Sequence, residues 1–319
     1  MRRVHVRADP LPPVPLREVS GLAVAEDAAG ALTLVAIGDR EAVVAWASVE
    51  HGPDDLDWHT EDLSGLSGTR IPHRDPQLEA VAADGCGGVL LVQEWPNRAE
   101  LVDAPSRRVT ADLDLVVPPD GQWAPLHRAW QDPHGSHAEG VVLLRGGRLL
   151  VIAEKDPAAL VEFGPAGAAP AGFGPGQWLP AGQRWLPATP AAGAGGSGGA
   201  DPAVGEGTVV LTALAAWYPD RELSEACPDL SDATVGIYGN LALLSDKGHA
   251  VALVAPHRPA DDPAAGVATA VVVVDVAGLA DKPEGLALLP NGDILIACDR
   301  PKARDNLFVI RRAAWRSLA

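Results

Sequence analysis

Residues 283–299, PEGLALLPNGDILIACD, contain two apolar runs separated by the turn signal Pro-Asn-Gly-Asp. Two apolar runs joined by a turn rich in Gly and Asn predict a β-hairpin. The predicted hairpin carries an acid at each open end, Glu284 near its start and Asp299 at its finish. The same layout recurs along the chain, which indicates an internal repeat.

Four other segments share this layout. They are VSGLAV with LTLVAIGDR within 19–40, LEAVAADGCGGVLLVQE at 78–94, AEGVVLLRGGRLLVIAE at 138–154 and LSDATVGIYGNLALLSD at 230–246. In four of the five copies, 15 residues separate the first polar residue from the acid that ends the second strand. The first copy has 19, because its turn is longer. Regular spacing of this kind favours a repeat architecture over unrelated hairpins.

The copies begin 59, 60, 92 and 53 residues apart, and the long interval contains a segment rich in Gly, Ala and Pro at 164–207. That composition suits neither strands nor a buried face, so we expect an insertion that folds over one face as a lid or stays mobile. If about 40 residues of this segment are left out of the count, the distance between repeats matches the length of a four-stranded propeller blade.

Two further strands follow each hairpin except the last, which has one, and the N-terminal VHVRA can supply its missing fourth strand. The sequence therefore predicts an all-β, five-bladed β-propeller occupying residues 1–319 as one domain, with the N-terminal strand closing the last blade. Two alternatives stay open: a six-bladed propeller that uses part of 170–223, and a pair of β-sandwiches.

The net charge of −17 has the wrong sign for binding a phosphate backbone, so no nucleic-acid partner is expected. The N-terminus lacks a secretory apolar run and no segment is long enough to cross a membrane, so we expect a soluble, cytoplasmic protein. Cys86, Cys227 and Cys298 lack paired spacing and are expected to be buried thiols. Motifs of the common serine hydrolases, nucleotide phosphatases and dehydrogenases are absent.

The first strand of each propeller blade lines the central channel, so equivalent side chains of the repeat should form a ring there. The predicted ring is Ser20, Glu79, Glu139, Ser231 and Glu284. Three carboxylates in a narrow channel repel one another unless protonated or neutralised. Hard oxygen donors without thiolate or imidazole favour Ca²⁺ as the bound cation. The alternative is that these glutamates cap strand ends and bind no metal.

The second strands return to the same face and predict a wider acidic rim, made of Asp39, Glu94, Glu154, Asp246 and Asp299. Basic residues follow each acid directly or closely: Arg40, Arg98, Lys155, Lys247 and Arg300. Bases around a metal suit an anionic small molecule, above all a phosphate. The alternative is that acids and bases simply pair on the surface. His137, two residues before Glu139, is a candidate general base or an ordinary loop histidine.

The ring order Ser, Glu, Glu, Ser, Glu resembles the central calcium site of the apyrase family, the soluble calcium-activated nucleotidases. The phrases LEAVAAD, AEGVVLL, LSDATV and PEGLALL also resemble the phytase-like esterase domain. The resemblance implies a five-bladed propeller whose five ring residues hold calcium and whose rim bases hold a phosphoester. It implies a Ca²⁺-dependent hydrolase in which Arg98 and Lys155 offset charge and Glu94, Glu154 or His137 takes a proton, while the remaining rim residues bind substrate.

Two other functions stay open. One is a non-catalytic propeller in which calcium pins the channel and Trp95, Trp123 and Trp130 anchor a partner or a metabolite. The other is a calcium-dependent lactonase or esterase, which would use asparagine ligands. Asn97 and Asn240 are present but fall outside the repeated position.

Overall fold

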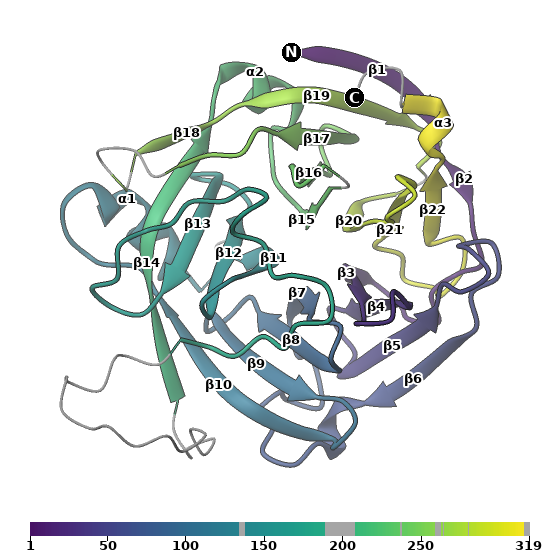
Figure 1. Cartoon of the computed structure of the whole chain (residues 1–319), viewed down its shortest axis with the longest axis horizontal. Helices are drawn as coiled ribbons and strands as arrows, with labels where there is room; N and C mark the ends of the chain where they lie inside the picture. Colours follow the sequence, from purple (N-terminus) through teal and green to yellow (C-terminus); the bar gives the residue numbers. More distant parts are fainter. Residues whose placement is uncertain are drawn as a thin grey trace.

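In the computed structural model, the strands form five blades around a central axis (Figure 1). The structure describes residues 1–133, 138–188, 208–236, 238–258, 263, 265–279 and 281–315. Each blade begins with an inner strand, and these five strands contact one another in a closed ring. Among the described residues no sixth blade is formed, because the region 170–223 contributes one long strand and a short helix. The five-bladed all-β prediction is confirmed.

The strands run outward from the axis in chain order. Blade 1 consists of β3 (Val19–Glu26), β4 (Leu32–Gly38), β5 (Val43–Ser48) and β6 (Trp58–Asp62). Blade 2 consists of β7 (Leu78–Ala83), β8 (Gly88–Gln93), β9 (Arg98–Asp103) and β10 (Arg108–Val116). Blade 3 consists of β11 (Ala138–Leu144), β12 (Arg148–Ala153), β13 (Ala159–Gly164) and β14 (Thr208–Pro219).

The last two blades each take in part of the N-terminus. Blade 4 consists of β15 (Asp232–Val235), β16 (Leu241–Ser245), β17 (Ala250–Val254), β19 (Ala270–Ala277) and β1 (Arg2–Arg7). Blade 5 consists of β20 (Pro283–Leu288), β21 (Ile294–Cys298), β22 (Leu307–Ile310) and β2 (Asp9–Pro10). Short helices lie at the periphery: η1 (Leu63–Gly65), η2 (Gly121–Trp123), α1 (Ala124–Trp130), α2 (Arg221–Ala226) and α3 (Arg312–Trp315). No helix of the described chain is long and apolar enough to span a membrane.

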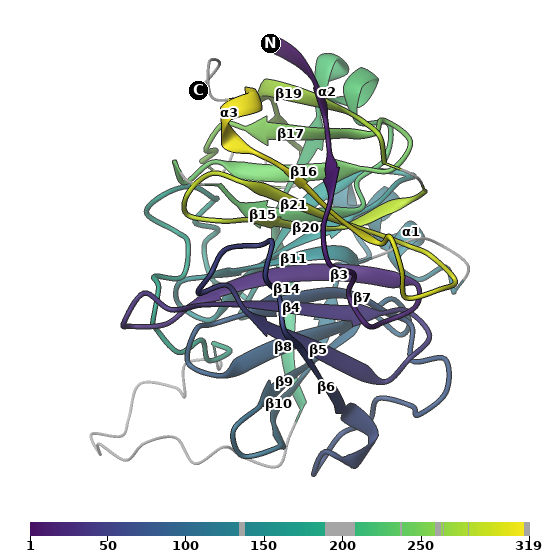
Figure 2. The same ribbon diagram turned by 90° about the vertical axis from the view of Figure 1, so that its right-hand side faces the viewer.

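The N-terminal segment closes the ring one step later than predicted. The stretch 4–7 lies within β1, which pairs in parallel with β19 as a fifth strand of blade 4 (Figures 1 and 2). The next residues form β2, which pairs antiparallel with β22 and completes blade 5. This pairing buries apolar surface, because Val6 packs with Val274 and Val276 of the valine-rich β19. The prediction holds for closure of the last blade but was wrong about which residues supply it.

Two blades are hydrogen-bonded to each other. Strand β10 of blade 2 pairs in parallel with β14 of blade 3, and β18 (Gly266–Ala268) pairs with the far end of β14. Five apolar clusters fill the spaces between neighbouring blades and consist mainly of Val, Leu, Ile and Ala. The core therefore lies between the faces of adjacent blades, and the inner strands are fixed from both sides.

The inner strands approach one another very closely near the axis. The residue after each ring position is Gly21, Ala80, Gly140, Asp232 and Gly285 in chain order. A Cβ at Gly140 would lie 2.8 Å from the backbone nitrogen of Ala233, and one at Gly285 would lie 2.9 Å from Cβ of Leu22. Glycine is therefore required by space at these positions, because larger side chains would push neighbouring blades apart.

In blade 4 the residue at this position is Asp232. Its carboxylate is buried and accepts hydrogen bonds from the backbone nitrogens of Ala233 at 2.7 Å and Leu286 at 2.6 Å. The backbone N–H of Leu22 donates to it as well. One side chain of blade 4 thus joins the inner strands of blades 5 and 1.

The described part of the insertion lies over one end of the axis, and it buries side chains, which its composition did not predict. Residues 165–188, called the strap below, bury Phe173, Trp178 and Trp185 against blades 2, 3 and 4. The buried carboxylate of Glu162 accepts hydrogen bonds from the backbone nitrogens of Ala171 and Gly172, which fixes the start of the strap. Three large aromatic side chains are enough to dock a segment otherwise made of small residues. Residues 189–207 lie outside the described part of the chain.

We expect Gly140→Ala to lower the free energy of unfolding by about 1–3 kcal/mol, because the added methyl overlaps backbone atoms of blade 4. Urea denaturation followed by circular dichroism measures the change. Ala80→Gly, at the equivalent position of blade 2, is the control and should cost no more than about 1 kcal/mol. A Gly140→Ala protein as stable as the parent would contradict this account of the axis.

Candidate functional site

The predicted ring residues lie at one end of the central axis. Ser20, Glu79, Glu139 and Glu284 are on the inner strands of blades 1, 2, 3 and 5, and Ser231 directly precedes β15 of blade 4. In those four strands the pairing with the second strand shifts register at the ring residue: between Val19 and Gly21, Leu78 and Ala80, Ala138 and Gly140, and Pro283 and Gly285. A β-bulge of this kind re-aims the side chain that it carries. The repeat therefore conserves a bulge as well as a polar residue.

Burial and neighbouring charges raise the pKa values of the three ring glutamates. Burial is the main cause that raises the pKa of Glu79 and Glu139 well above the usual value. Repulsion from neighbouring carboxylates raises both pKa values further. Glu79 is repelled by Glu139, Asp39, Glu284 and Glu94, and Glu139 is repelled by Glu154, Glu94 and Glu284. Burial likewise raises the pKa of Glu284 to about 7, although the ammonium of Lys282 opposes the shift. The structure thus brings the ring carboxylates together with each other and with the rim.

The two ring serines are already hydrogen-bonded. The Ser20 hydroxyl donates to the backbone oxygen of Leu78 at 2.5 Å, and the Ser231 hydroxyl accepts from the backbone nitrogen of Asp246 at 2.9 Å. Glu284 forms an ion pair with Lys282. Within the described ranges, no three His, Cys, Asp or Glu side chains converge closely enough to hold a metal ion. The metal role predicted for the ring stays a prediction.

The predicted rim acids interact electrostatically with one another. Burial is the first cause that raises the pKa of Asp39, Glu94, Asp246 and Asp299. Their mutual effects cross blades, since Asp39 and Glu154 both repel Glu94. Ring and rim together form the axial acidic cluster: Glu79, Glu139, Glu284, Asp39, Glu94, Glu154, Asp246 and Asp299.

The bases that follow the rim acids all have acidic partners. The ion pairs are Arg40 with Glu18 at 2.7 Å, Lys155 with Glu154 at 2.6 Å, Lys247 with Asp229 at 3.9 Å and Arg300 with Asp281 at 2.8 Å. Arg98 lies 3.8 Å from Asp112 of β10 and donates to the Gln93 side chain at 3.0 Å, so its guanidinium is engaged within blade 2. These contacts match the alternative in which the acids and bases simply pair with one another.

The sequence analysis overlooked two charged residues of this region. Lys282 is the base nearest the ring, and its attraction to Glu284, Glu139 and Asp299 raises its pKa despite burial. Asp232 was not predicted to have a role. Lys282 could have been found from its place two residues before Glu284, the spacing that His137 has before Glu139.

The remaining candidates have different surroundings. His137 lies outside the described residues. Trp130 is buried between blades 2 and 3, where its ring centroid lies 5.5 Å from that of Phe163 and its indole donates to the Leu115 backbone oxygen at 2.9 Å. It is therefore a packing residue rather than an exposed anchor. Trp95 is 36% exposed, and Trp123 packs partly against the same apolar cluster as Trp130.

Comparison with known proteins finds similarity in structure alone. No family model matches this chain, and no curated protein matches its sequence. It is similar to glutaminyl cyclase of Myxococcus xanthus (TM-score 0.45, 12% identity, covering 97% of this chain and 98% of that one). It is also similar to hydrazine synthase of Kuenenia stuttgartiensis (0.41, 13%, 97% and 98%) and to the PQQ-bound aldose sugar dehydrogenase of Streptomyces coelicolor (0.36, 13%, 95% and 96%).

The raised pKa values predict how stability depends on pH. A carboxyl that is protonated more readily in the folded than in the unfolded state favours folding at low pH. The contribution of Glu284 is therefore complete below its usual pKa of 4.5 and is lost as the pH rises through about 7. From that shift we expect a loss of about 3 kcal/mol in the free energy of unfolding across this window.

Glu139→Gln removes one of the repelling charges, so it should become more stable relative to the parent as the pH rises through the same window. Urea denaturation of both proteins at a series of pH values measures the difference. Glu50→Gln, on the exposed surface, is the control and should follow the parent. A constant difference between Glu139→Gln and the parent would contradict the coupling of the ring.

Proposed function

We propose that the axial acidic cluster binds a divalent cation, Ca²⁺ by preference, and that the chain is a Ca²⁺-dependent hydrolase of an anionic small molecule, with phosphoesters as the substrate class. The observation that carries the proposal is a set of three glutamates held at β-bulges in one ring, Glu284 buried and Glu79 and Glu139 partly buried, whose charges repel one another. A fold that buries like charges gains most from an ion that neutralises them.

The donor chemistry fits a hard divalent cation. The ring offers carboxylate and hydroxyl oxygens, with neither thiolate nor imidazole among its members. Lys282 forms an ion pair with Glu284, so one ring carboxylate has a positive partner within the chain. Glu79, Glu139 and Glu284 would hold the ion, with Ser20 and Ser231 beside them, after their carboxylates draw closer together than they lie in this structure. When bound, Ca²⁺ would polarise a phosphoryl oxygen or a water molecule.

The chain's own residues supply binding and proton transfer. Lys282 and Lys155 both interact electrostatically with Glu139, so their ammonium groups would receive an anionic substrate at the same place. Glu94 is half-buried and its pKa is raised, which suits a group that accepts a proton near neutral pH. Arg40 and Arg300 lie farther out and hold charge on the rim. The resemblance of the ring order to the apyrase family supports the choice of phosphoesters.

A second function is favoured by a specific observation. The bases that follow the rim acids are all engaged with acidic side chains, which leaves them less available to a substrate. This arrangement suits a non-catalytic propeller in which the cation only pins the ring. The lactonase alternative has less support, because Asn97 is buried and donates to the Trp130 backbone oxygen at 2.6 Å.

Calorimetric titration of Ca²⁺ into protein stripped with EGTA tests the cation site. We expect one site at about pH 8, with proton release and weaker binding at about pH 5, because the ion must displace protons from the ring. Glu139→Gln should weaken binding at least about tenfold, which corresponds to about 1.4 kcal/mol, while Glu50→Gln should bind as the parent does. Absence of binding at millimolar Ca²⁺ would overturn the proposal.

Turnover separates the two functions. A screen of nucleoside diphosphates, sugar phosphates, phytate and aryl esters, with and without Ca²⁺, should reveal hydrolysis that Glu139→Gln abolishes. If Ca²⁺ raises the melting temperature but no substrate is turned over, the pinned scaffold is the function instead. Hydrolysis that persists unchanged in EGTA and in Glu139→Gln would contradict both.

A further inference from the structure

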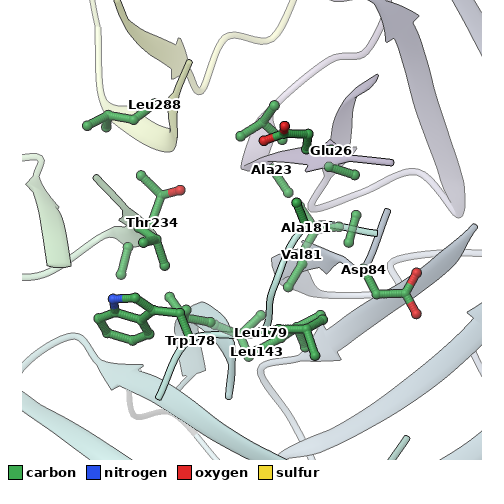
Figure 3. Close-up of a pocket in the computed structure, with 18 of the residues that line it drawn as sticks. Ala23, Glu26, Val81, Asp84, Leu143, Trp178, Leu179, Ala181, Thr234 and Leu288 are labelled. Carbon is green, nitrogen blue, oxygen red and sulfur yellow. The ribbon is translucent and has the colours of Figure 1, made fainter. Parts of the chain in front are cut away.

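The other end of the central axis holds a cavity of about 360 Å³ (Figure 3). The far halves of the five inner strands line it, and the strap residues Trp178, Leu179, Pro180 and Ala181 form one wall. Its volume falls in the range of small-molecule sites, roughly 300–1,000 Å³. The cavity lies on the opposite side of Asp232 from the acidic cluster, so it is a separate site.

The wall formed by the strap is a built feature. Strap residues pair with the free edge of β11: the backbone nitrogen of Leu179 donates to Leu143 at 3.1 Å, and that of Arg145 donates to Gln177 at 2.8 Å. Farther along, the Gly182 nitrogen donates to the backbone oxygen of Glu26 at 2.8 Å. The strap is therefore tied to blades 3 and 1 on either side of the opening.

Trp178 anchors the strap beside the cavity. Its indole nitrogen donates to the backbone oxygen of Gly239 at 2.7 Å, and its ring centroid lies 6.1 Å from that of Phe173. Figure 3 shows Trp178 at the cavity together with Val81, Leu143 and Leu288. Trp178 is only 6% exposed, so it contributes to an apolar wall and does not offer an open ring face.

The polar groups of the cavity set the charge of its occupant. Figure 3 shows the Thr234 hydroxyl at the cavity, and within the described chain this hydroxyl makes no hydrogen bond. No basic side chain is among the lining residues, whereas Glu26 and Asp84 lie at the edge. The Asp84 carboxylate is occupied by the backbone nitrogens of Cys86, Gly88 and Trp185. The site therefore disfavours anions and offers one hydroxyl for a hydrogen bond.

We propose that this cavity binds a small, uncharged, largely apolar molecule, whose polar group reaches Thr234. The inner strands add further partners. Each pairs along one edge with the second strand of its blade, and the other edge of β11 also pairs with the strap. The axis-facing edges of the other inner strands leave some backbone N–H and C=O groups available. The proposal is independent of any cation at the acidic end.

Fluorescence titration with N-phenyl-1-naphthylamine, an uncharged aromatic probe, tests the proposal on the full chain. We expect one probe per chain, bound with micromolar affinity. The anionic analogue 1-anilinonaphthalene-8-sulfonate has the same ring body, and we expect it to bind at least about tenfold more weakly, because no base lines the cavity. Equal binding of the two probes would overturn the assigned charge class.

Two substitutions in the strap locate the bound probe. Ala181→Phe places a ring in the cavity from an exposed position, so it should weaken probe binding at least about tenfold without unfolding the chain. Ala169→Phe makes the same change at an exposed strap residue away from the lining and should bind as the parent does. Absence of probe binding, or binding that Ala181→Phe leaves unchanged, would overturn the site.

Discussion

The close approach of five inner strands at the axis is the constraint on which this structure depends. Four of the five residues next to the ring are Gly or Ala, and the fifth is Asp232, whose carboxylate accepts backbone N–H groups from two other blades. Small residues permit the contact, and the aspartate ties it together. A buried carboxylate is tolerated only where hydrogen bonds compensate for its lost hydration. Asp232 gains these hydrogen bonds only when the strands of the other two blades are in place, so the axis is stable as a set of strands rather than as separate pairs.

This constraint also divides the molecule into two chemically different ends. On one side, bulges place glutamates in a ring, and burial keeps their pKa values high. On the other side, the same strands present alanine, valine and leucine beneath the strap. One repeat therefore builds a polar end and an apolar end, because successive positions along each inner strand face different surroundings.

Much of the architecture could be predicted from repeat spacing. The hairpins at 78–94 and 283–299 show where inner strands begin, and from them follow the blade count and the position of Glu79 and Glu284. The charge partners could not be predicted in this way. Lys282 meets the ring because a loop between blades brings it there, and the pairs that engage Arg98 and Arg300 depend on side-chain direction. The strap was misjudged because average composition conceals three well-spaced aromatic residues.

The N-terminal strands have a consequence for the order of assembly. Strands β1 and β2 find their partners on β19 and β22, about 270 to 300 residues farther along the chain. During synthesis residues 1–10 therefore lack their native strand partners until nearly all the rest has emerged from the ribosome. Closure of the circle must be a late event, because β19 and β22 are synthesised long after the strands that complete their blades.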